Sequence, residues 1–423
     1  MDIFISEVVE KCIEKLKEAG FEAFVVGGCV RDSIIARIPN DWDVCTSALP
    51  SQTKLVFKEY RTVDVGIDHG TVTVVMENEN IEITTYRVDG EYKDNRRPEK
   101  VEFTFKIQED LSRRDFTINA MAYNHESGLI DFFNGRQDID KRIIRCVGDP
   151  IKRFNEDALR IMRALRFAAQ LNYTIEEDTL KAVKGSKELL RNISSERIAV
   201  ELNKLVMAEK PKDMIKLLFE MDIFKIIIEY MHNCSVKVDN LNNFTEDCGQ
   251  IIEACPQDLS IRLCVLFNFI AELYKIEDDS KSVVENFEVE KFFRSLKYDN
   301  ITIKEIDILN RYYNSDISYE KREIKKILNL IDLEMFKKLI FMKTAIERNF
   351  SSDRYIKLLN SIEENNECYR IKDLKINGRD LIAQGIKNGK VIGESLNTAL
   401  QIVIENPEMN DRERLLKEIK KIN

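Results

Sequence analysis

Two patterns of hydrophobic and polar positions divide the chain. Residues 1–19 place apolar side chains three and four positions apart, which predicts an amphipathic helix that stops at Gly20. Short β-branched runs follow, separated by Pro, Asn, Asp and Gly, at 23–26, 42–45, 62–65, 71–76 and 81–86. After Pro150 the strand signals nearly vanish and helical periodicity continues. The pattern predicts an α/β first part followed by a long helical part.

Length and charge refine this division. With 423 residues the chain is too long for one ordinary core and should form several domains. The net charge is −9, yet residues 141–170 hold eight Lys or Arg against three acids, a local net charge of +5. Residues 181–216 add nine basic and five acidic side chains. A localised basic stripe on an acidic chain is typical of a partner bound along one groove.

The cysteines and the apolar runs bear on the compartment. The nine cysteines are odd in number and form no CxxC pair, which favours reduced thiols in the cytoplasm. No run approaches the roughly 20 apolar residues of a membrane span. The amphipathic, acidic first residues are expected to be neither a signal nor a transit peptide. We therefore expect a cytoplasmic protein that does not insert into membranes.

The segment 27–43, GGCVRDSIIARIPNDWD, is the most informative in the chain. Side chains alternate along a strand, so Asp41 and Asp43 are expected to share a face. Two such carboxylates repel each other unless cations lie between them, and their hard oxygens suit Mg²⁺. Gly27 and Gly28 leave backbone N–H groups open to close approach by a phosphate. The segment predicts a site for a metal-bound nucleoside triphosphate.

A third carboxylate is expected on a neighbouring strand. In residues 81–87, IEITTYR, Glu82 and Thr84 face one way and the isoleucines the other. Glu82 is therefore a candidate to join the aspartate pair as a metal ligand or as a base. The alternative is a glutamate on the solvent face of the sheet, and the sequence favours neither.

The segment 111–122, LSRRDFTINAMA, concentrates polar side chains of several kinds. The planar guanidinium group of an arginine such as Arg114 can donate paired hydrogen bonds to triphosphate oxygens. Asp115 and Asn119 can form hydrogen bonds with sugar hydroxyls. Taken alone, an Arg-Arg-Asp run is more often a capped helix start than a binding site.

The segment 155–170, NEDALRIMRALRFAAQ, is predicted to form one continuous helix. At roughly 100° per residue, Arg160, Arg163 and Arg166 occupy one arc, opposite an apolar stripe. Asp157 lies at its edge, one turn before Arg160. The ordinary interpretation is a solvated basic face. The sharper hypothesis is that Asp157 and Arg160 are braced together and read the hydrogen-bonding edge of a base, because a mismatched edge leaves buried groups unpaired.

Five motifs taken together resemble a known family. GGCVRD with DWD, ITTYR, RRDFTINAMA and EDALRIMRALRFAAQ, in this order and spacing, are similar to class II tRNA nucleotidyltransferases of the polymerase-beta-like superfamily. The resemblance is dense over 20–205, weaker over 210–330, and returns at 376–416. It implies an α+β nucleotidyltransferase head with a small mixed sheet, followed by an all-α neck, body and tail. The expected bounds are 1–149, 150–208, 209–335 and 336–423.

The resemblance also implies roles for individual residues. It implies that Asp41 and Asp43 hold two Mg²⁺ ions and that Asp157 and Arg160 read the incoming base, while Glu82 remains a candidate from strand alternation alone. The implied nucleotide-binding residues are Gly27, Gly28, Arg31, Arg114, Asp115, Asn119, Arg163 and Arg166, of which Arg166 points well away from Asp157. Residues 89–98, DGEYKDNRRP, resemble a loop that helps switch from C to A addition, and residues 195–201 resemble a motif supporting the base-reading helix.

The implied reaction is untemplated addition of C, C and A to the 3′ end of tRNA. The 3′-hydroxyl attacks the α-phosphate of CTP or ATP and pyrophosphate leaves, with two metal ions stabilising the developing charge. The implied partners are tRNA, CTP and ATP, with no protein partner. Three alternatives stay open: a bacterial poly(A) polymerase, an enzyme that adds only A, and a non-catalytic RNA-binding protein that kept the fold. The aspartate pair speaks against the last.

Overall fold

A computed structural model describes residues 3–77, 79–90, 101–232, 234–238, 244–277 and 287–422. The chain divides into two compact units. The first comprises Met1–Gly249 with Leu273–Asn286 and Ser295–Lys297, and the second comprises Gln250–Glu272, Phe287–Arg294 and Tyr298–Asn423. Each unit is described by itself below. The division into head, neck, body and tail stays a prediction.

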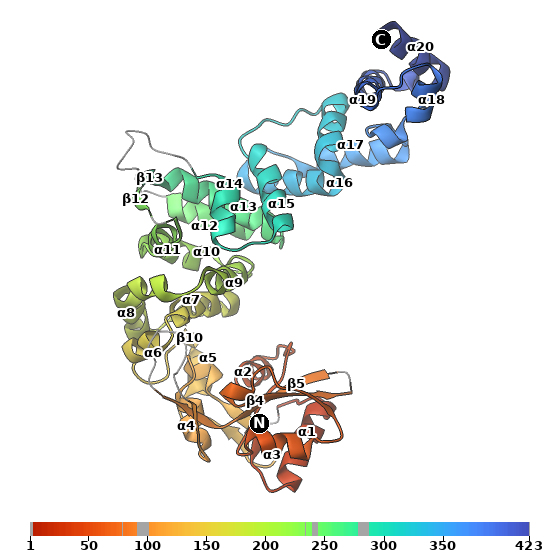
Figure 1. The fold of residues 1–423 in the computed structure, drawn as a ribbon. Coiled ribbons are helices and arrows are strands. Elements are labelled where there is room, and N and C mark those ends of the chain that lie inside the picture. The colour runs from red at the N-terminus through yellow and green to blue at the C-terminus, as the bar shows by residue number, and fades with distance from the viewer. Residues whose placement is uncertain are drawn as a thin grey trace. The chain divides into compact units, whose positions relative to one another are not determined.

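A seven-stranded mixed sheet, drawn in red to orange in Figure 1, forms the start of the first unit. Its strand order is β3-β4-β5-β2-β1-β8-β9. The strands are β1 (Ala23–Val26), β2 (Asp43–Thr46), β3 (Arg61–Val63), β4 (Thr71–Met76), β5 (Glu79–Thr85), β8 (Ala122–Asn124) and β9 (Gly128–Ile130). Within this sheet, β2 and β5 pair in parallel and the other described pairs are antiparallel. The parallel pair places the start of β2 beside the middle of β5.

Apolar side chains anchor this sheet. Phe24 and Val26 of β1 pack with Cys45 of β2 and with Tyr86 and Leu111, all of them buried. Burial of such side chains is the main favourable term in folding. Helices α1 (Glu7–Glu18) and α3 (Pro50–Val56) pack on the same sheet (Figure 1). The core therefore holds the ends of β1 and β2 in place, and these are the points where the polar motifs begin.

The rest of the first unit is mainly helical. Its helices are α2 (Gly28–Ile34), α4 (Ile107–Ser112), α5 (Gly135–Lys141), α6 (Pro150–Glu156), α7 (Leu159–Leu171), α8 (Glu177–Ser186), α9 (Ser195–Val206), α10 (Lys212–Glu220) and α11 (Ile223–His232). Three small two-stranded sheets pair β6 (Arg87–Asp89) with β7 (Val101–Phe103), β10 (Ile143–Ile144) with β11 (Thr174–Ile175), and β12 (Ser235–Val238) with β13 (Tyr274–Glu277). Helices α7 and α9 pack against each other.

Helices make up the remainder of the described chain. They are α12 (Phe244–Ala254), α13 (Leu259–Leu273), α14 (Val289–Ser295), α15 (Asn300–Arg311), α16 (Lys321–Ile346), α17 (Ser352–Glu364), α18 (Gly378–Ala383), α19 (Gly389–Glu405) and α20 (Arg412–Ile422). Asp332 interrupts α16 with a φ of 59°. Leu381, Leu400 and Leu415 belong to one buried cluster that joins α18, α19 and α20. No described helix is both long and apolar enough to cross a membrane.

Most of the predicted elements are confirmed, and one is wrong. The five β-branched runs form β1 to β5, and the first helical pattern forms α1. The predicted continuous helix over 155–170 does not exist, because α6 ends at Glu156 and Asp157 is extended, with φ −140° and ψ 103°. The Asp157 carboxylate accepts a hydrogen bond from the N–H of Leu159 at 3.1 Å. Such a local side-chain bond competes with helix continuation, so a new helix, α7, begins here.

Candidate active site

Three carboxylates gather where β2 and β5 run side by side. Asp43, the first residue of β2, is paired in register with Glu82 of β5, so both side chains leave the sheet on one face. Asp41 is exposed and lies two residues earlier. Burial raises the pKa of Asp43 to about 6, and the charges of Asp41 and Glu82 add to this rise while Arg114 opposes it. The structure thus brings together all three predicted carboxylates.

The chemistry of these carboxylates fits a divalent cation. Their oxygens are hard ligands, and a cation would offset both the burial of the Asp43 charge, which is the main cause of its raised pKa, and the smaller repulsion from Asp41 and Glu82. Within the described ranges, no group of three or more His, Cys, Asp or Glu side chains is placed so that it could hold a metal ion. A cation held by Asp41 and Asp43 would therefore need water or phosphate oxygens as further ligands, as is common for Mg²⁺.

The glycine pair lies at the turn from β1 into α2, and one expectation about it is wrong. The N–H of Gly27 is not open to a ligand, because it donates to the carbonyl of Met121 at 3.1 Å. Gly27 instead has a φ of 85°, and a Cβ atom at this position would lie 2.9 Å from Nη1 of Arg114. The position therefore needs glycine both for its backbone conformation and for the close approach of Arg114.

We expect Gly27→Ala to raise the KM for the nucleoside triphosphate that the sequence predicts about tenfold, with the affinity for the predicted RNA partner unchanged, because the new methyl group displaces Arg114. Steady-state kinetics with each nucleotide measures this effect. Gly20→Ala is the matched control, since Gly20 has a φ of 87° but a Cβ added there would have no atom within 4 Å. An equal rise in KM in both variants would mean that backbone strain alone is responsible.

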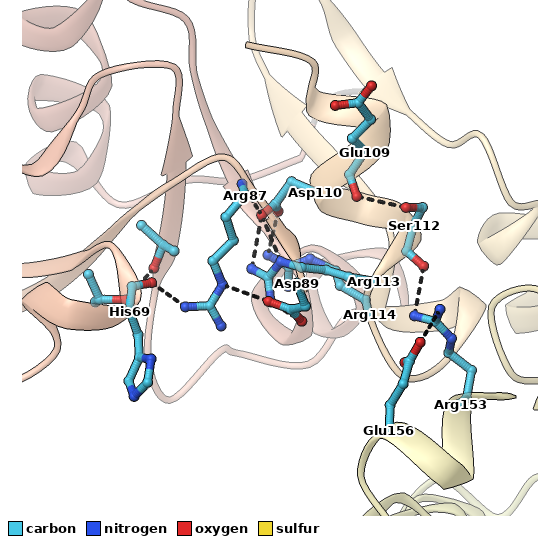
Figure 2. A network of polar contacts seen from close by, with 12 residues as sticks. His69, Arg87, Asp89, Glu109, Asp110, Ser112, Arg113, Arg114, Arg153 and Glu156 are labelled. Carbon is cyan, nitrogen blue, oxygen red and sulfur yellow. Dashed lines mark hydrogen bonds and ion pairs between the residues drawn. The ribbon is translucent and has the colours of Figure 1, made fainter. Parts of the chain in front are cut away.

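A buried acid holds the arginine pair that precedes Asp115. Asp110 of α4 is fully buried and accepts from Arg113 at 2.9 Å and from Arg114 at 3.4 Å. Burial acts to raise the pKa of Asp110, but the two arginine charges outweigh it and hold the pKa below its usual range. Figure 2 shows both arginines turned toward this carboxylate. Asp110 therefore fixes the direction of Arg114, whose charge acts on Asp43 of β2.

The same network continues from the small β6–β7 sheet to α6. Figure 2 shows Arg87 reaching the carbonyl of His69 and the carboxylate of Asp89, which also lies 3.8 Å from Arg113. On the other side, Arg153 of α6 donates to the carbonyl of Ser112 at 3.2 Å and pairs with Glu156 at 2.7 Å. Polar contacts thus connect the start of the predicted loop to the helix that precedes Asp157.

The predicted loop itself lies mostly outside the described residues. Of residues 89–98, only Asp89 and Gly90 are described. Its proposed part in switching from C to A addition therefore stays a prediction.

An arginine-rich cavity shares Arg114, whose charge acts on Asp43, with the carboxylate group. Its volume is about 250 Å³, and its lining residues are Arg113, Arg114, Asp115, Asp157, Leu159, Arg160, Arg163 and Arg197. Sites for drug-sized ligands usually measure roughly 300–1,000 Å³, so this cavity suits a smaller group such as one base. Nε of Arg114 and Nη1 of Arg197 are buried and donate to no described residue. Buried donors of this kind are rare in folded proteins and indicate that a ligand supplies acceptors.

The predicted brace between Asp157 and Arg160 is wrong, although both line the cavity. Asp157 pairs with Arg197 of α9 at 2.8 Å. Arg160 pairs with Glu156 at 2.8 Å and donates to the carbonyls of Arg153 and Arg113 at 3.1 and 2.9 Å. The broken helix explains the difference, because the backbone of Asp157 is extended and its side chain does not take the direction that a helical residue one turn before Arg160 would have. Each is held separately, and both keep a fixed direction at the cavity wall.

Asp115 connects the cavity to the turn after β1. Its carboxylate accepts two bonds from Arg163, at 2.6 and 2.8 Å, and one from Asn119 at 3.2 Å. Burial acts to raise the pKa of Asp115, but the charge of Arg163 outweighs it and holds the pKa well below its usual range. Asn119 in turn accepts from Arg31 at 2.6 Å. The predicted residues Arg31, Asn119, Asp115 and Arg163 therefore form one continuous chain of polar contacts.

The ordinary interpretation of α7, a basic face in contact with solvent, is wrong for two of its three arginines. Arg160 and Arg166 are 8% and 6% exposed. Arg166 does not line the cavity; it pairs with the buried Glu201 of α9 at 2.5 Å and stacks on the ring of Phe167, 3.8 Å from its centroid. Arg31 and Arg163 also lie over this ring, at 5.1 and 5.3 Å. The contacts of Arg166 indicate that it holds α7 against α9.

Sequence reasoning missed three residues of this site. Asp110 had a local signal, since its spacing of three and four residues from Arg113 and Arg114 is that of neighbours on a helix. Arg113 itself belonged to the quoted Arg-Arg-Asp run. Arg197 was placed in a supporting motif, but its contact with Asp157, 40 residues away, had no signal in the local pattern.

The chain is similar to known proteins over almost its whole length. Family profiles match the poly A polymerase head domain at residues 23–145, an RNA and SrmB binding site of polymerase A at 172–234, and tRNA nucleotidyltransferase domain 2 at 282–419. The CCA-adding enzyme of Ligilactobacillus salivarius is 34% identical, over 97% of this chain and 95% of its own. That of Lactobacillus delbrueckii subsp. bulgaricus is 36% identical, over 97% of each chain.

A solved structure extends the likeness to three dimensions. The Bacillus stearothermophilus CCA-adding enzyme in complex with CTP is 29% identical, with a TM-score of 0.80 over 99% of this chain and 97% of its own. The sequence relatives cover almost the whole chain at more than 30% identity, and the fold agrees over the same length. The chain therefore belongs to the family of CCA-adding enzymes.

Proposed function

We propose that this protein adds C, C and A to the 3′ end of tRNA, using CTP and ATP and releasing pyrophosphate. The observation that carries the proposal is the position of Arg114. This arginine lines the base-sized cavity, approaches Gly27, and acts on the charge of Asp43. One side chain thus connects a base-sized cavity with a group of carboxylates, and this arrangement supports the proposal of nucleotidyl transfer.

In the proposed reaction, the 3′-hydroxyl of the RNA attacks the α-phosphate in line and pyrophosphate leaves. Arg31, Arg114 and Arg163 bind and orient the triphosphate, with Asp115 and Asn119 holding two of them in place. Asp157 and Arg160 present an acceptor and a donor to the base. Because these side chains are held by protein contacts, the choice of nucleotide needs no nucleic-acid template.

Enzymes of this family use divalent metal ions. We propose that Asp41 and Asp43 hold two Mg²⁺ ions here, with Glu82 beside them. When bound, such ions stabilise the charge that develops on the attacking and leaving oxygens. We further propose that the protein acts in the cytoplasm and that the head, neck, body and tail span 1–149, 150–208, 209–335 and 336–423.

Transcripts of tRNA ending one, two and three nucleotides short of the mature 3′ end test the function. Incubation with CTP and ATP separately should extend those lacking three or two nucleotides with CTP only and the one lacking a single nucleotide with ATP only. Sequencing of the products identifies each added nucleotide. An enzyme that accepts ATP alone would be an A-adding relative, and repeated A addition to unrelated RNA would indicate a poly(A) polymerase.

A further inference from the structure

We propose that a second basic cavity, at the far end of α7, binds the unpaired 3′ strand of the RNA substrate. This inference rests on the proposed function and assigns a separate subsite to the acceptor strand. The cavity measures about 380 Å³ and is lined by Ile34, Ile35, Arg37, Arg136, Ile139, Asp140, Arg142, Leu171 and Tyr173. None of these residues lines the cavity that contains Asp157 and Arg160.

The charge of this cavity suits a phosphodiester strand. Arg136 pairs with Asp140 at 3.2 Å, so these two charges offset each other. Arg37 donates one bond to the carbonyl of Gln170 at 3.2 Å. The Arg142 side chain forms no ion pair or hydrogen bond with any described residue and is exposed. The charges of Arg37 and Arg142 are therefore available to an anion. The planar guanidinium group of arginine fits the geometry of phosphate oxygens.

An aromatic ring and an exposed aliphatic side chain accompany these charges. Tyr173 is partly buried and lies close enough to Arg142, Arg31 and Arg37 for their charges to act on its hydroxyl. Ile38, next to Arg37, is 92% exposed. Basic side chains interleaved with rings on which bases stack are typical of sites for single-stranded nucleic acid. A free phosphate or pyrophosphate would need the charges but not the ring.

The position of the cavity along the chain agrees with an acceptor strand. Arg37 lies four residues before Asp41, and four extended residues reach at most about 14 Å, a distance that a few nucleotides span. Arg160, at the first cavity, and Leu171, at the second, are both on α7 and lie roughly 16 Å apart along its axis. The incoming nucleotide would occupy the first cavity, while nucleotides preceding the 3′ end would occupy the second.

Binding of a tRNA transcript that lacks the three terminal nucleotides tests the arginines. Arg142→Asn introduces a residue that tolerates the φ of 56° found at this position, so the change removes the charge without straining the backbone. We expect Arg142→Asn and Arg37→Ala each to weaken binding about three- to tenfold and to reduce the slope of log K against log salt by about 0.7. Lys58→Asn, which removes an exposed charge elsewhere on the first unit, is the matched control and should change neither quantity.

Tyrosine variants separate stacking from charge. Tyr173→Leu should raise the KM for tRNA about fivefold or more, while Tyr173→Phe keeps the ring and should remain near wild type. The KM for CTP should stay within about twofold in every variant. Unchanged RNA affinity and salt dependence in both arginine variants would overturn the inference. A raised KM for CTP or altered inhibition by pyrophosphate, with RNA affinity unchanged, would overturn it in favour of a mononucleotide or pyrophosphate subsite.

These outcomes are distinct from failure of the proposed function. If the wild-type protein adds no nucleotide to any tRNA transcript, the proposed function is wrong whatever the variants do. If the wild type adds C, C and A but the variants bind RNA normally, only the second cavity is wrongly assigned. Circular dichroism of each variant confirms that the fold is retained.

Discussion

Asp43→Asn is expected to lower nucleotidyl transfer by about a thousandfold or more while tRNA affinity stays close to wild type. The reason is that the change removes a carboxylate from the proposed metal site, and each tenfold loss of rate corresponds to about 1.4 kcal/mol of lost transition-state stabilisation. Single-turnover transfer with saturating CTP measures the chemical step, and filter binding measures tRNA affinity. Transfer near the wild-type rate would refute the metal assignment.

The same change is expected to stabilise the metal-free protein at neutral pH. Because the pKa of Asp43 is raised to about 6, the folded state binds this proton more tightly than the unfolded state does. Stability therefore falls as the pH rises from about 4, the usual pKa of an aspartate, to about 6. Above that pH, Asp43→Asn removes a repelled, partly buried charge and should raise the Tm by roughly 2–5 °C.

Thermal melts in EDTA between pH 4 and pH 8 measure this effect. The gain in Tm should shrink toward pH 4, where Asp43 is protonated in the wild type as well. Asp41→Asn is the matched comparison and should give a smaller gain in Tm, because Asp41 is exposed and its removal relieves only one of the charges that act on Asp43. Loss of transfer with no gain in Tm at pH 8 would mean that the carboxylates are less crowded than the structure indicates.

Arg160→Ala is expected to reduce the discrimination between CTP and ATP by about 10- to 100-fold, since loss of one buried donor to a base edge removes about 1–3 kcal/mol of discrimination. The effect should appear in the ratio of kcat/KM for the two nucleotides on a tRNA that awaits C. Arg160 suits this role because Glu156 and two backbone carbonyls hold its guanidinium at the cavity wall.

Two further variants make this result specific. Arg160→Lys keeps the charge but loses the planar fork, so it should lose discrimination as well. Lys58→Ala removes one exposed positive charge away from the cavity and should keep the wild-type ratio. The affinity for tRNA should be the same in all three variants. Unchanged discrimination between CTP and ATP in both Arg160 variants would assign base reading to other residues of the cavity.

Local pattern was sufficient for much of the fold. The β-branched runs became β1 to β5 with small shifts at their ends, because alternation along a strand is a property of neighbouring residues. The predicted site residues of the head were also brought together, although they lie on elements of different kinds, such as Glu82 in the middle of β5. Asp43 and Arg31 illustrate this, at the start of β2 and in the helix after β1.

Local pattern failed where a side chain competes with the backbone. The prediction that paired Asp157 with Arg160 placed residues at about 100° intervals and so assumed one helix through both. The carboxylate of Asp157 instead caps the N–H of Leu159 at 3.1 Å, which ends one helix and starts the next. Periodicity cannot register such a break, because the apolar positions on either side continue with the same spacing.

The sequence by itself determined which chemical groups the protein has and in which order they occur: the aspartate pair, the Arg-Arg-Asp run and the basic stretch after residue 140. Only the tertiary structure decided which groups meet. Asp157 meets Arg197, 40 residues away, and Asp115 meets Arg163, 48 residues away. These contacts depend on how α7 packs on α9 and on the head. Such long-range packing is set by side-chain shape and burial, which spacing along the chain does not contain.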